Sequence, residues 1–360
     1  MSITQSAPGW ESLPAWRNRP ADQRFFCLDS LHTVCRDKAE ASVSQTFNAT
    51  EVIAVNHEDR DIRIETPKFT GRVNDWSFSQ LAGLASVPGE YLKRICPELA
   101  VINLNYGLQY LRHVDNSLFY WWPNGQPETP ELRAVTGTGY GRYHDFRCVE
   151  DVQEITNGEW TVPWDLTERP AATTLYTSDR DVWMFLVDQK HEIKVPGQEK
   201  PAYRGFLVRN SEVGAGSWSL QSFLYNTVCD NRMVLGMTEI GSIKIRHSSS
   251  APDRIRWEGK AMLRDFANAS PAQIETRLKR AQEIRINRDE NPNEWIRKQG
   301  FTKAMSDRIF KRALDEQGKC ETAWDAIQGL TAMARDVPNT DHRVRIETDA
   351  GLLFDRISKN

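Results

Sequence analysis

The sequence contains no apolar run that approaches the roughly 18 residues of a membrane-spanning helix. Its first residues, MSITQSAPGWESLPAW, lack the basic start and the apolar stretch of a signal peptide. The six cysteines are scattered and form no CxxC pair, so we expect free thiols in a reducing compartment. These absences argue against a membrane or secreted protein and predict a cytoplasmic one.

Motifs of several common enzyme and cofactor classes are absent too. The sequence has no GxxxxGK[ST], HExxH or GxSxG, and no spaced carboxylate cluster of the kind that holds Mg²⁺. The run Gly137-Thr138-Gly139-Tyr140-Gly141 has glycines that would let backbone N–H groups approach a phosphate. A dinucleotide site needs a helix after its glycines, and the residues that follow Gly141 are not an apolar helix start. We favour a turn here and expect no cofactor.

One irregularly spaced group of residues of the types that bind metal ions suggests a zinc site as an alternative. Cys27, His32 and Cys35 would seed a zinc site if a fourth ligand such as His57 joined them. Zinc sites usually show two close pairs of ligands, and only this one triple is present. We therefore favour ordinary thiols with a surface histidine, and expect no metal.

The composition is that of a folded globular protein, with 39% hydrophobic and 26% charged residues. The net charge of −3 argues weakly against a protein that coats nucleic acid through its overall charge. The charge is unevenly distributed, however, because residues 253–313 carry fifteen Lys and Arg against nine Asp and Glu. A local basic groove therefore stays compatible with the sequence.

Two kinds of periodicity alternate along the chain. Short β-rich runs separated by Gly, Pro and Asp predict strands at 52–55, 61–65, 118–122, 132–136, 173–177, 182–187, 206–209 and 243–246, with a short closing strand near 344–346. Apolar spacings of three and four predict helices at 77–85, 90–95, 218–233, 270–285, 305–314 and 320–334. We therefore expect an α+β fold: a mixed or antiparallel sheet core with flanking helices and a helical C-terminal region.

The same patterns suggest three regions. We expect residues 1–50 to form an irregular N-terminal arm, residues 51–250 an α+β core domain, and residues 251–360 a mainly helical C-terminal region. The stretch 270–300, which is rich in Asn and charge, is the expected linker or mobile loop.

Several segments look like parts of one known family. The run FSQLA at 78–82 with VPGEYL at 87–92 looks like that family's opening helix, and Asn103-Leu104-Asn105 looks like its Asn-containing strand. Arg133-Ala134-Val135 with Tyr140 is similar to a further segment, although Gly137 stands where the family usually has Ser.

The most specific segment is Asn210-Ser211-Glu212-Val213-Gly214, followed by Val228-Cys229, Asn231 and Arg246-His247. On these residues the chain resembles the phage- and plasmid-like proteins whose core is the domain of unknown function numbered 932. The resemblance covers about residues 60 to 355. It implies carriage on mobile elements and a cytosolic location, but no settled biochemical activity.

Arg and Asn residues beside a Gly-rich turn can hold phosphates through side chains and backbone donors. Nearby aromatic side chains, among them Trp218 and Tyr225, can stack on unpaired bases. The alternative is that Asn210 and Ser211 cap a helix and Glu212 accepts from its first turn. The candidate nucleic-acid-binding residues are Arg133, Tyr140, Arg142, Tyr143, Arg204, Arg209, Asn210, Ser211, Asn231, Arg232, Arg246 and His247.

The sequence thus favours a non-enzymatic nucleic-acid-binding protein of a phage or plasmid. We expect a homo-oligomer that binds or anneals single-stranded DNA in recombination or replication. One alternative is a protein–protein interaction factor that counters a host defence. A less favoured alternative is a nucleic-acid-processing enzyme that uses Glu212, Asp179 or His247. Separately, Cys229 would be a nucleophile if a histidine such as His247 lay close, but we favour buried packing for it.

Overall fold

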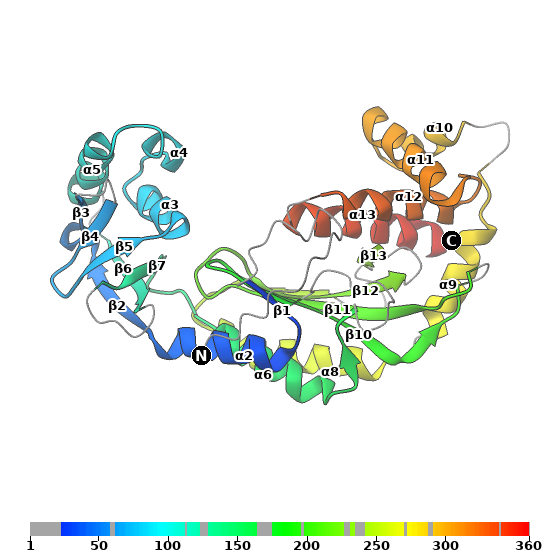
Figure 1. Cartoon of the computed structure of the whole chain (residues 1–360), viewed down its shortest axis with the longest axis horizontal. Coiled ribbons are helices and arrows are strands. Elements are labelled where there is room, and N and C mark those ends of the chain that lie inside the picture. The colour runs from blue at the N-terminus through cyan, green and yellow to red at the C-terminus, as the bar shows by residue number, and fades with distance from the viewer. Residues whose placement is uncertain are drawn as a thin grey trace.

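The computed structural model of the chain describes residues 23–57, 62–111, 114–122, 129–163, 175–195, 198–226, 231–234, 242–269, 272–286, 291–337 and 340–359. Figure 1 shows an elongated molecule with a smaller lobe at one end and a larger body. Within the described residues, no helix is both long and apolar enough to cross a membrane.

The body is built on an antiparallel sheet, with strands ordered β1-β9-β10-β11-β12-β13, to which β8 adds on β10 and β14 on β12. The first seven residues of β10 are all buried, as expected for a central strand covered on both faces. The strands are β1 (Arg24–Phe25), β8 (Trp160–Thr161), β9 (Leu175–Thr177), β10 (Val182–Ile193), β11 (Ala202–Asn210), β12 (Trp218–Asn226), β13 (Asn231–Val234) and β14 (Ser242–Ile245).

The smaller lobe, residues 42–137, is called the N-terminal lobe below. Its sheet has the order β2-β6-β7-β5-β4-β3 and is mixed, because β5 and β7 are parallel while the other pairs are antiparallel. The strands are β2 (Ser42–Asn48), β3 (Ile53–Asn56), β4 (Ile62–Glu65), β5 (Thr70–Val73), β6 (Asp115–Trp121) and β7 (Glu131–Gly137). The helical segments are η2 (Ala49–Glu51), α3 (Asp75–Leu84), α4 (Gly89–Leu92), α5 (Pro97–Tyr106) and η3 (Gly107–Leu111).

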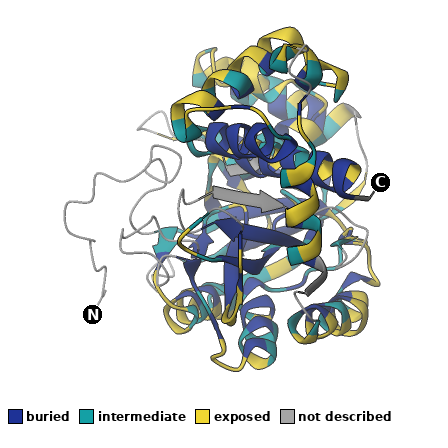
Figure 2. Ribbon diagram, turned by 90° about the vertical axis from the view of Figure 1, so that its right-hand side faces the viewer, coloured by how far each residue is buried: buried dark blue, intermediate teal, exposed yellow. Residues whose placement is uncertain are grey.

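Helices cover both faces of the body sheet (Figure 1). Below it lie α2 (Leu28–Glu40), α6 (Asp145–Thr156), α7 (Ala251–Arg254), η6 (Ile255–Gly259) and α8 (Lys260–Asn268), which share one apolar core with the sheet. The C-terminal helices α9 (Ala272–Glu283), α10 (Pro292–Lys298), α11 (Lys303–Gln317), α12 (Ala323–Arg335) and α13 (Thr340–Lys359) enclose a separate core. Figure 2 shows the sheet in dark blue between outer helices whose exposed sides are yellow.

The α+β class is confirmed, including the mixed and antiparallel sheets and the helical C-terminal region. The boundaries expected near residues 50 and 250 stay predictions. The expected helix at 218–233 is wrong, because residues 218–226 form β12. From Ser222 onward this strand is buried on both faces, so the apolar residues there lose the alternation of an exposed strand and can be mistaken for a helical stripe.

Three further local predictions are also wrong. The irregular arm expected before residue 50 contains α2, whose inner face buries only Leu31 and Cys35 and so leaves a weak apolar stripe. The Asn-containing strand expected at 103–105 lies in α5. The closing strand near 344–346 lies in α13, where Arg343 and Glu347 form a buried i,i+4 ion pair, so polar residues occupy core positions. The first two residues of the helix predicted at 270–285 lie outside the described residues.

Candidate functional site

A cleft of about 890 Å³ lies between the N-terminal lobe and the body. Gln80 of α3 and the end of β7 form its wall on the lobe side. Residues of β10, β11, β12 and β14 form its floor, and Val344 of α13 lies at its edge. The segment 214–217, between β11 and β12, completes the lining.

Strand register builds the floor of the cleft. Trp183 on β10 pairs with Arg209 on β11, which pairs with Ser219 on β12, which in turn pairs with Lys244 on β14. Paired residues in an antiparallel sheet place their side chains on the same face. The four side chains therefore form one row across the sheet, and Arg246 follows Lys244 at the next position on that face.

The cleft is positively charged. None of its described lining residues is Asp or Glu, whereas Arg209, Lys244 and Arg246 are cations. Arg209 donates to the carboxylate of Asp181, with an Nη2–Oδ2 distance of 2.8 Å. Lys244 and Arg246 are exposed and form no ion pair with any described residue. An anionic ligand is thus the kind that this cleft is built to attract.

Among the cleft-lining side chains that are more than nine-tenths buried, three carry a polar atom without a hydrogen-bond partner among the described residues. They are Thr136 Oγ1, Trp183 Nε1 and His247 Nε2, on side chains that are all more than nine-tenths buried. Buried polar atoms are normally paired, so these atoms are potential contacts for a bound group.

The turn after β11 is held by Ser211 and Tyr140. Ser211 Oγ donates to the carbonyl of Arg180 at 2.6 Å and accepts from the N–H of Ala215 at 2.9 Å. Tyr140 Oη donates to the Ser211 carbonyl at 2.7 Å and accepts from the N–H of Gly214 at 3.1 Å. Gly214 has φ +84°, which favours glycine. The helix-capping alternative for Asn210 and Ser211 is wrong, since the turn leads into β12.

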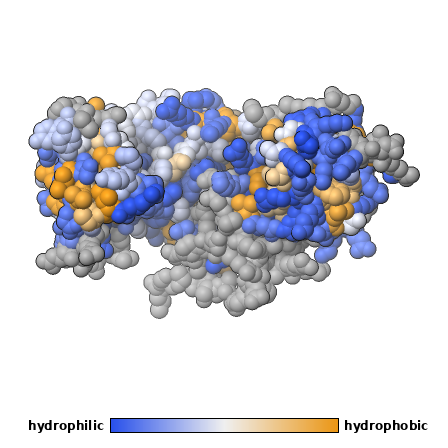
Figure 3. Space-filling model, turned by 90° about the horizontal axis from the view of Figure 1, so that it is seen from above, coloured by the Kyte–Doolittle hydropathy of each residue, from blue (hydrophilic) through white to orange (hydrophobic). Residues whose placement is uncertain are grey.

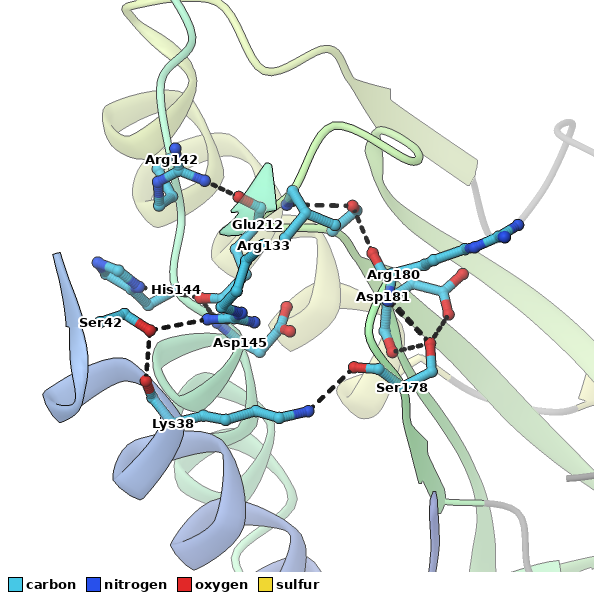
Figure 4. A network of polar contacts seen from close by, with 12 residues as sticks. Lys38, Ser42, Arg133, Arg142, His144, Asp145, Ser178, Arg180, Asp181 and Glu212 are labelled. Carbon is cyan, nitrogen blue, oxygen red and sulfur yellow. Dashed lines mark hydrogen bonds and ion pairs between the residues drawn. The ribbon is translucent and has the colours of Figure 1, made fainter. Parts of the chain in front are cut away.

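Glu212 lies at the centre of a buried polar network (Figure 4). Its carboxylate accepts from Arg133 Nη2 at 2.5 Å and from His144 Nδ1 at 2.9 Å. Arg142 donates to the Glu212 carbonyl. Although burial raises the pKa of Glu212, the charge of Arg133 and the hydrogen bond from His144 outweigh it and hold that pKa well below its usual range.

This network joins the lobe to the body. Arg133 belongs to β7 of the lobe, whereas Glu212 follows β11 and Asp145 begins α6. Asn210 Nδ2 donates to Asp145 Oδ1 at 2.7 Å, and burial together with the charge of Glu212 raises the pKa of Asp145 well above its usual value. Gln80 Nε2 adds a bond of 2.8 Å to the Val213 carbonyl. The geometry is that of a structural junction.

The predicted site residues divide into groups. Tyr140, Arg209, Arg246 and His247 line the cleft. Arg133, Arg142, Asn210 and Ser211 hold the adjoining turn and network. Tyr143 is buried in the core below the sheet.

Arg204, one of the predicted nucleic-acid-binding residues, does not lie at the cleft. Its side chain is 2% exposed and donates from Nε and Nη2 to Asp188 Oδ2 at 2.9 and 2.7 Å. Residues 231 and 232 lie on β13, in register with Asn226 and Tyr225 at the end of β12 away from the cleft. Of the stacking candidates, Trp218 and Tyr225 are buried in cores.

Sequence reasoning missed Lys244, Ser219, Trp183 and Gln80. A signal for Lys244 was present, because Lys244 and Arg246 alternate with Ile245 in a predicted strand and must share the face opposite to that apolar residue. The other three join the site only through cross-strand register or tertiary packing.

The remaining chemical candidates do not assemble. Cys35 is buried in the core below the sheet, whereas Cys27 is exposed and His32 bonds Glu150 at 3.1 Å. No cluster of metal-ligand side chains occurs in the part of the chain that the structure describes. Cys229 lies outside the described residues. Asp179 is in the turn between β9 and β10 and does not line the cleft.

The fold and site define an α+β protein with a positively charged cleft at the junction of two sheets. Residues 136–347 match the family described as a domain of unknown function, DUF932. Because this match covers more than half of the chain, the protein belongs to that family. The match includes Glu212 and all cleft-lining residues except Gln80 and Val135. No curated protein and no solved structure matches the chain.

His247 predicts an acid sensitivity of the folded protein. Burial lowers its pKa below the ordinary 6.5, with a further lowering by the charge of Arg142. The unfolded chain therefore binds a proton near pH 6.5 that the folded chain does not, so stability falls as the pH drops from 7 to 5. In urea unfolding at several pH values, His247→Gln should flatten this decline. His57→Gln, at an exposed histidine, is the control, and an unchanged slope in the cleft variant would contradict the assignment.

Proposed function

We propose that the protein is a non-enzymatic nucleic-acid-binding protein of a phage or plasmid, which acts in the cytoplasm and holds a single DNA strand in the cleft during recombination or replication. The observation that carries the proposal is the cleft itself: its lining has cations from β11 and from the β14 segment, and no carboxylate among the described residues. In a chain of net charge −3, such a concentration of one sign marks a site for anions.

Phosphates fit the cationic groups of this cleft. Lys244 and Arg246 are exposed and available, and an arginine can bind two phosphate oxygens at once. The segment 214–217 adds Ser217 at the same rim. Contacts of these kinds position a strand without reading its sequence.

Base stacking contributes less than the sequence predicted. The Tyr140 ring packs against His247, with ring centroids 5.1 Å apart, and Arg142 lies over it at 5.4 Å. The guanidinium of Arg209 lies 4.4 Å from the centre of the Trp183 ring. Because these rings already have partners, we expect strand binding to be dominated by phosphate contacts, with strong salt dependence and weak sequence preference.

The cleft cations provide the test. Lys244→Ala combined with Arg246→Ala is expected to weaken binding of a fluorescent single-stranded oligonucleotide at least tenfold, measured by anisotropy at low salt. Two lost phosphate contacts should also reduce the slope of log K against log salt by about 1.4. The matched control is Lys279→Ala with Arg280→Ala, which removes two exposed cations of α9 outside the cleft.

The outcomes separate strand binding itself from the assignment of the binding site to the cleft. A wild-type protein that binds no strand at low salt refutes the function. Equal losses in both double variants refute the cleft as the binding site. Full competition by inorganic phosphate or a mononucleotide at micromolar concentration would instead assign the cleft to a small anion.

A further inference from the structure

The outer surface of α5 and η3 carries an apolar stripe. Leu99, Ile102, Tyr106 and Tyr110 are 50%, 62%, 60% and 67% exposed. Their spacing of three, four and four residues places them along one side of a helix. The rings of Tyr106 and Tyr110 contact each other, with centroids 5.2 Å apart. These four residues are called the α5 stripe below.

The opposite side of the same helix is apolar as well. Ala100, Leu104 and Leu108 are completely buried in the core of the N-terminal lobe. Residues 99–111, LAVINLNYGLQYL, contain no charged residue. A helix that is apolar all round normally lies inside a protein, so a surface helix of this kind indicates a covering partner.

Exposed apolar residues are concentrated in this lobe. Of the twelve large hydrophobic residues exposed in the described chain, seven belong to it: the α5 stripe together with Ile53, Tyr91 and Val114. Figure 3 shows hydrophobic surface gathered at the end of the molecule formed by this lobe. Scattered single residues need no explanation, but a concentration of this kind marks an interaction site.

The stripe is rigidly presented. Asn105 on α5 bonds both the N–H and the carbonyl of Ala54 on β3, at 2.7 and 2.8 Å. Gly107 lets the helix seat closely on α3, since a Cβ there would meet the Ala85 carbonyl oxygen at 2.0 Å. A surface fixed before binding loses little entropy when a partner covers it.

We propose that the α5 stripe is the interface through which two copies of this chain form a symmetric dimer. The two helices run antiparallel across a two-fold axis near Ile102 and Tyr106, so that Leu99 packs against the partner's Tyr110. The uncharged run 99–111 meets itself without like-charge repulsion, which self-association of a charged face would incur. A nucleic acid is a poor occupant because the stripe offers it no cation.

The available area fits a dimer. A stable interface buries about 800 Å² on each partner, around an apolar centre with a polar rim. The seven exposed residues supply several hundred Å² of apolar surface, which is the size of such a centre. The stripe is on the outer end of the lobe and its residues do not line the cleft. Dimerisation therefore leaves both clefts open.

Sedimentation velocity from 1 to 100 µM tests the interface. The wild-type chain of 41.3 kDa is expected to sediment as a dimer, and Ile102→Asp with Tyr106→Asp to sediment as a monomer, with a dissociation constant raised at least hundredfold. Trp257→Asp is the control, because Trp257 is 73% exposed and lies on η6 of the body. Circular dichroism melting checks that each variant is folded.

A second variant keeps the test decisive if the double variant fails to fold. Ile102→Cys combined with Tyr106→Cys is expected to cross-link into a disulfide dimer under mild oxidation, to a greater extent than either the wild type or Trp257→Cys, because the two-fold axis between these positions sets residue 102 of one copy opposite residue 106 of the other. A wild-type protein that stays monomeric at 100 µM overturns the proposal. So does a dimer that survives the aspartates and gives no extra cross-link.

Discussion

Replacement of Glu212 by glutamine is expected to lower the free energy of unfolding by about 3–5 kcal/mol, because it leaves Arg133 as a buried charge without its counterion. The two side chains are 2% and 4% exposed and join at 2.5 Å. Glutamine keeps the size of the side chain, but it does not neutralise the guanidinium, and its single amide oxygen replaces the two carboxylate oxygens that accept from Arg133 and His144. Urea unfolding followed by circular dichroism measures the loss.

Asp75 supplies a matched control for this prediction. Its carboxylate also crosses from the lobe to the body, through Arg180 Nη2 at 2.8 Å, but both side chains are about half exposed. Asp75→Asn makes the same chemical change and should cost less than about 1 kcal/mol, since solvent screens an exposed pair. Equal losses in the two variants would show that burial does not set the strength of the Glu212 network.

A double variant separates charge from packing. Arg133→Met with Glu212→Leu removes both charges and keeps apolar volume, so it should be more stable than Glu212→Gln alone. The bond from Arg133 Nη1 to Ser42 Oγ at 3.1 Å is also lost, so recovery is expected to be incomplete. A double variant less stable than the single one would indicate that the ion pair itself is a net stabiliser of the junction.

The sequence correctly predicted those helices and strands that carry one clear local pattern. The run Val182–Val187 was recognised as a strand because six consecutive apolar residues leave little alternative in a chain with turn residues on either side. The helix predicted at 77–85 from its apolar spacing is present as α3, which begins after Asn74, whose side chain accepts from the N–H of Ser77 at 2.8 Å. Where tertiary packing buried polar residues, as in α13, the same rules failed.

The site was only partly predictable for a related reason. Tyr140, Arg209 and His247 were identified because they lie near recognisable sequence segments. The partners of Arg209 in the cross-strand row come from strands far apart in the sequence, and their register is set by the whole sheet. The identity of a residue as arginine also does not show whether its side chain is buried. Arg204 was therefore grouped with arginines that line the cleft, although the fold buries it in the body.

Arg204→Met is expected to lower the free energy of unfolding by about 3–5 kcal/mol while leaving DNA binding by the folded protein unchanged. The arginine fork compensates Asp188 and also donates to the carbonyls of Phe266, Ala267 and Ala269 at the end of α8. Its removal therefore leaves a buried carboxylate and unpaired helix carbonyls. Arg204→Lys should rescue little, because an ammonium cannot reproduce this planar set of donors.

Arg209→Met is the matched comparison on the same strand. Arg209 pairs with Asp181 through a side chain that is 20% exposed, and it lines the cleft. Its loss should cost less stability than that of Arg204 and should weaken strand binding, reducing the salt slope by about 0.7. The two variants should therefore rank in opposite orders in the two measurements: Arg204→Met should lose more stability in urea unfolding, and Arg209→Met should lose more strand binding in oligonucleotide anisotropy. If Arg204→Met lost strand binding while still folded, the assignment of Arg204 to the core of the body and not to the cleft would be refuted.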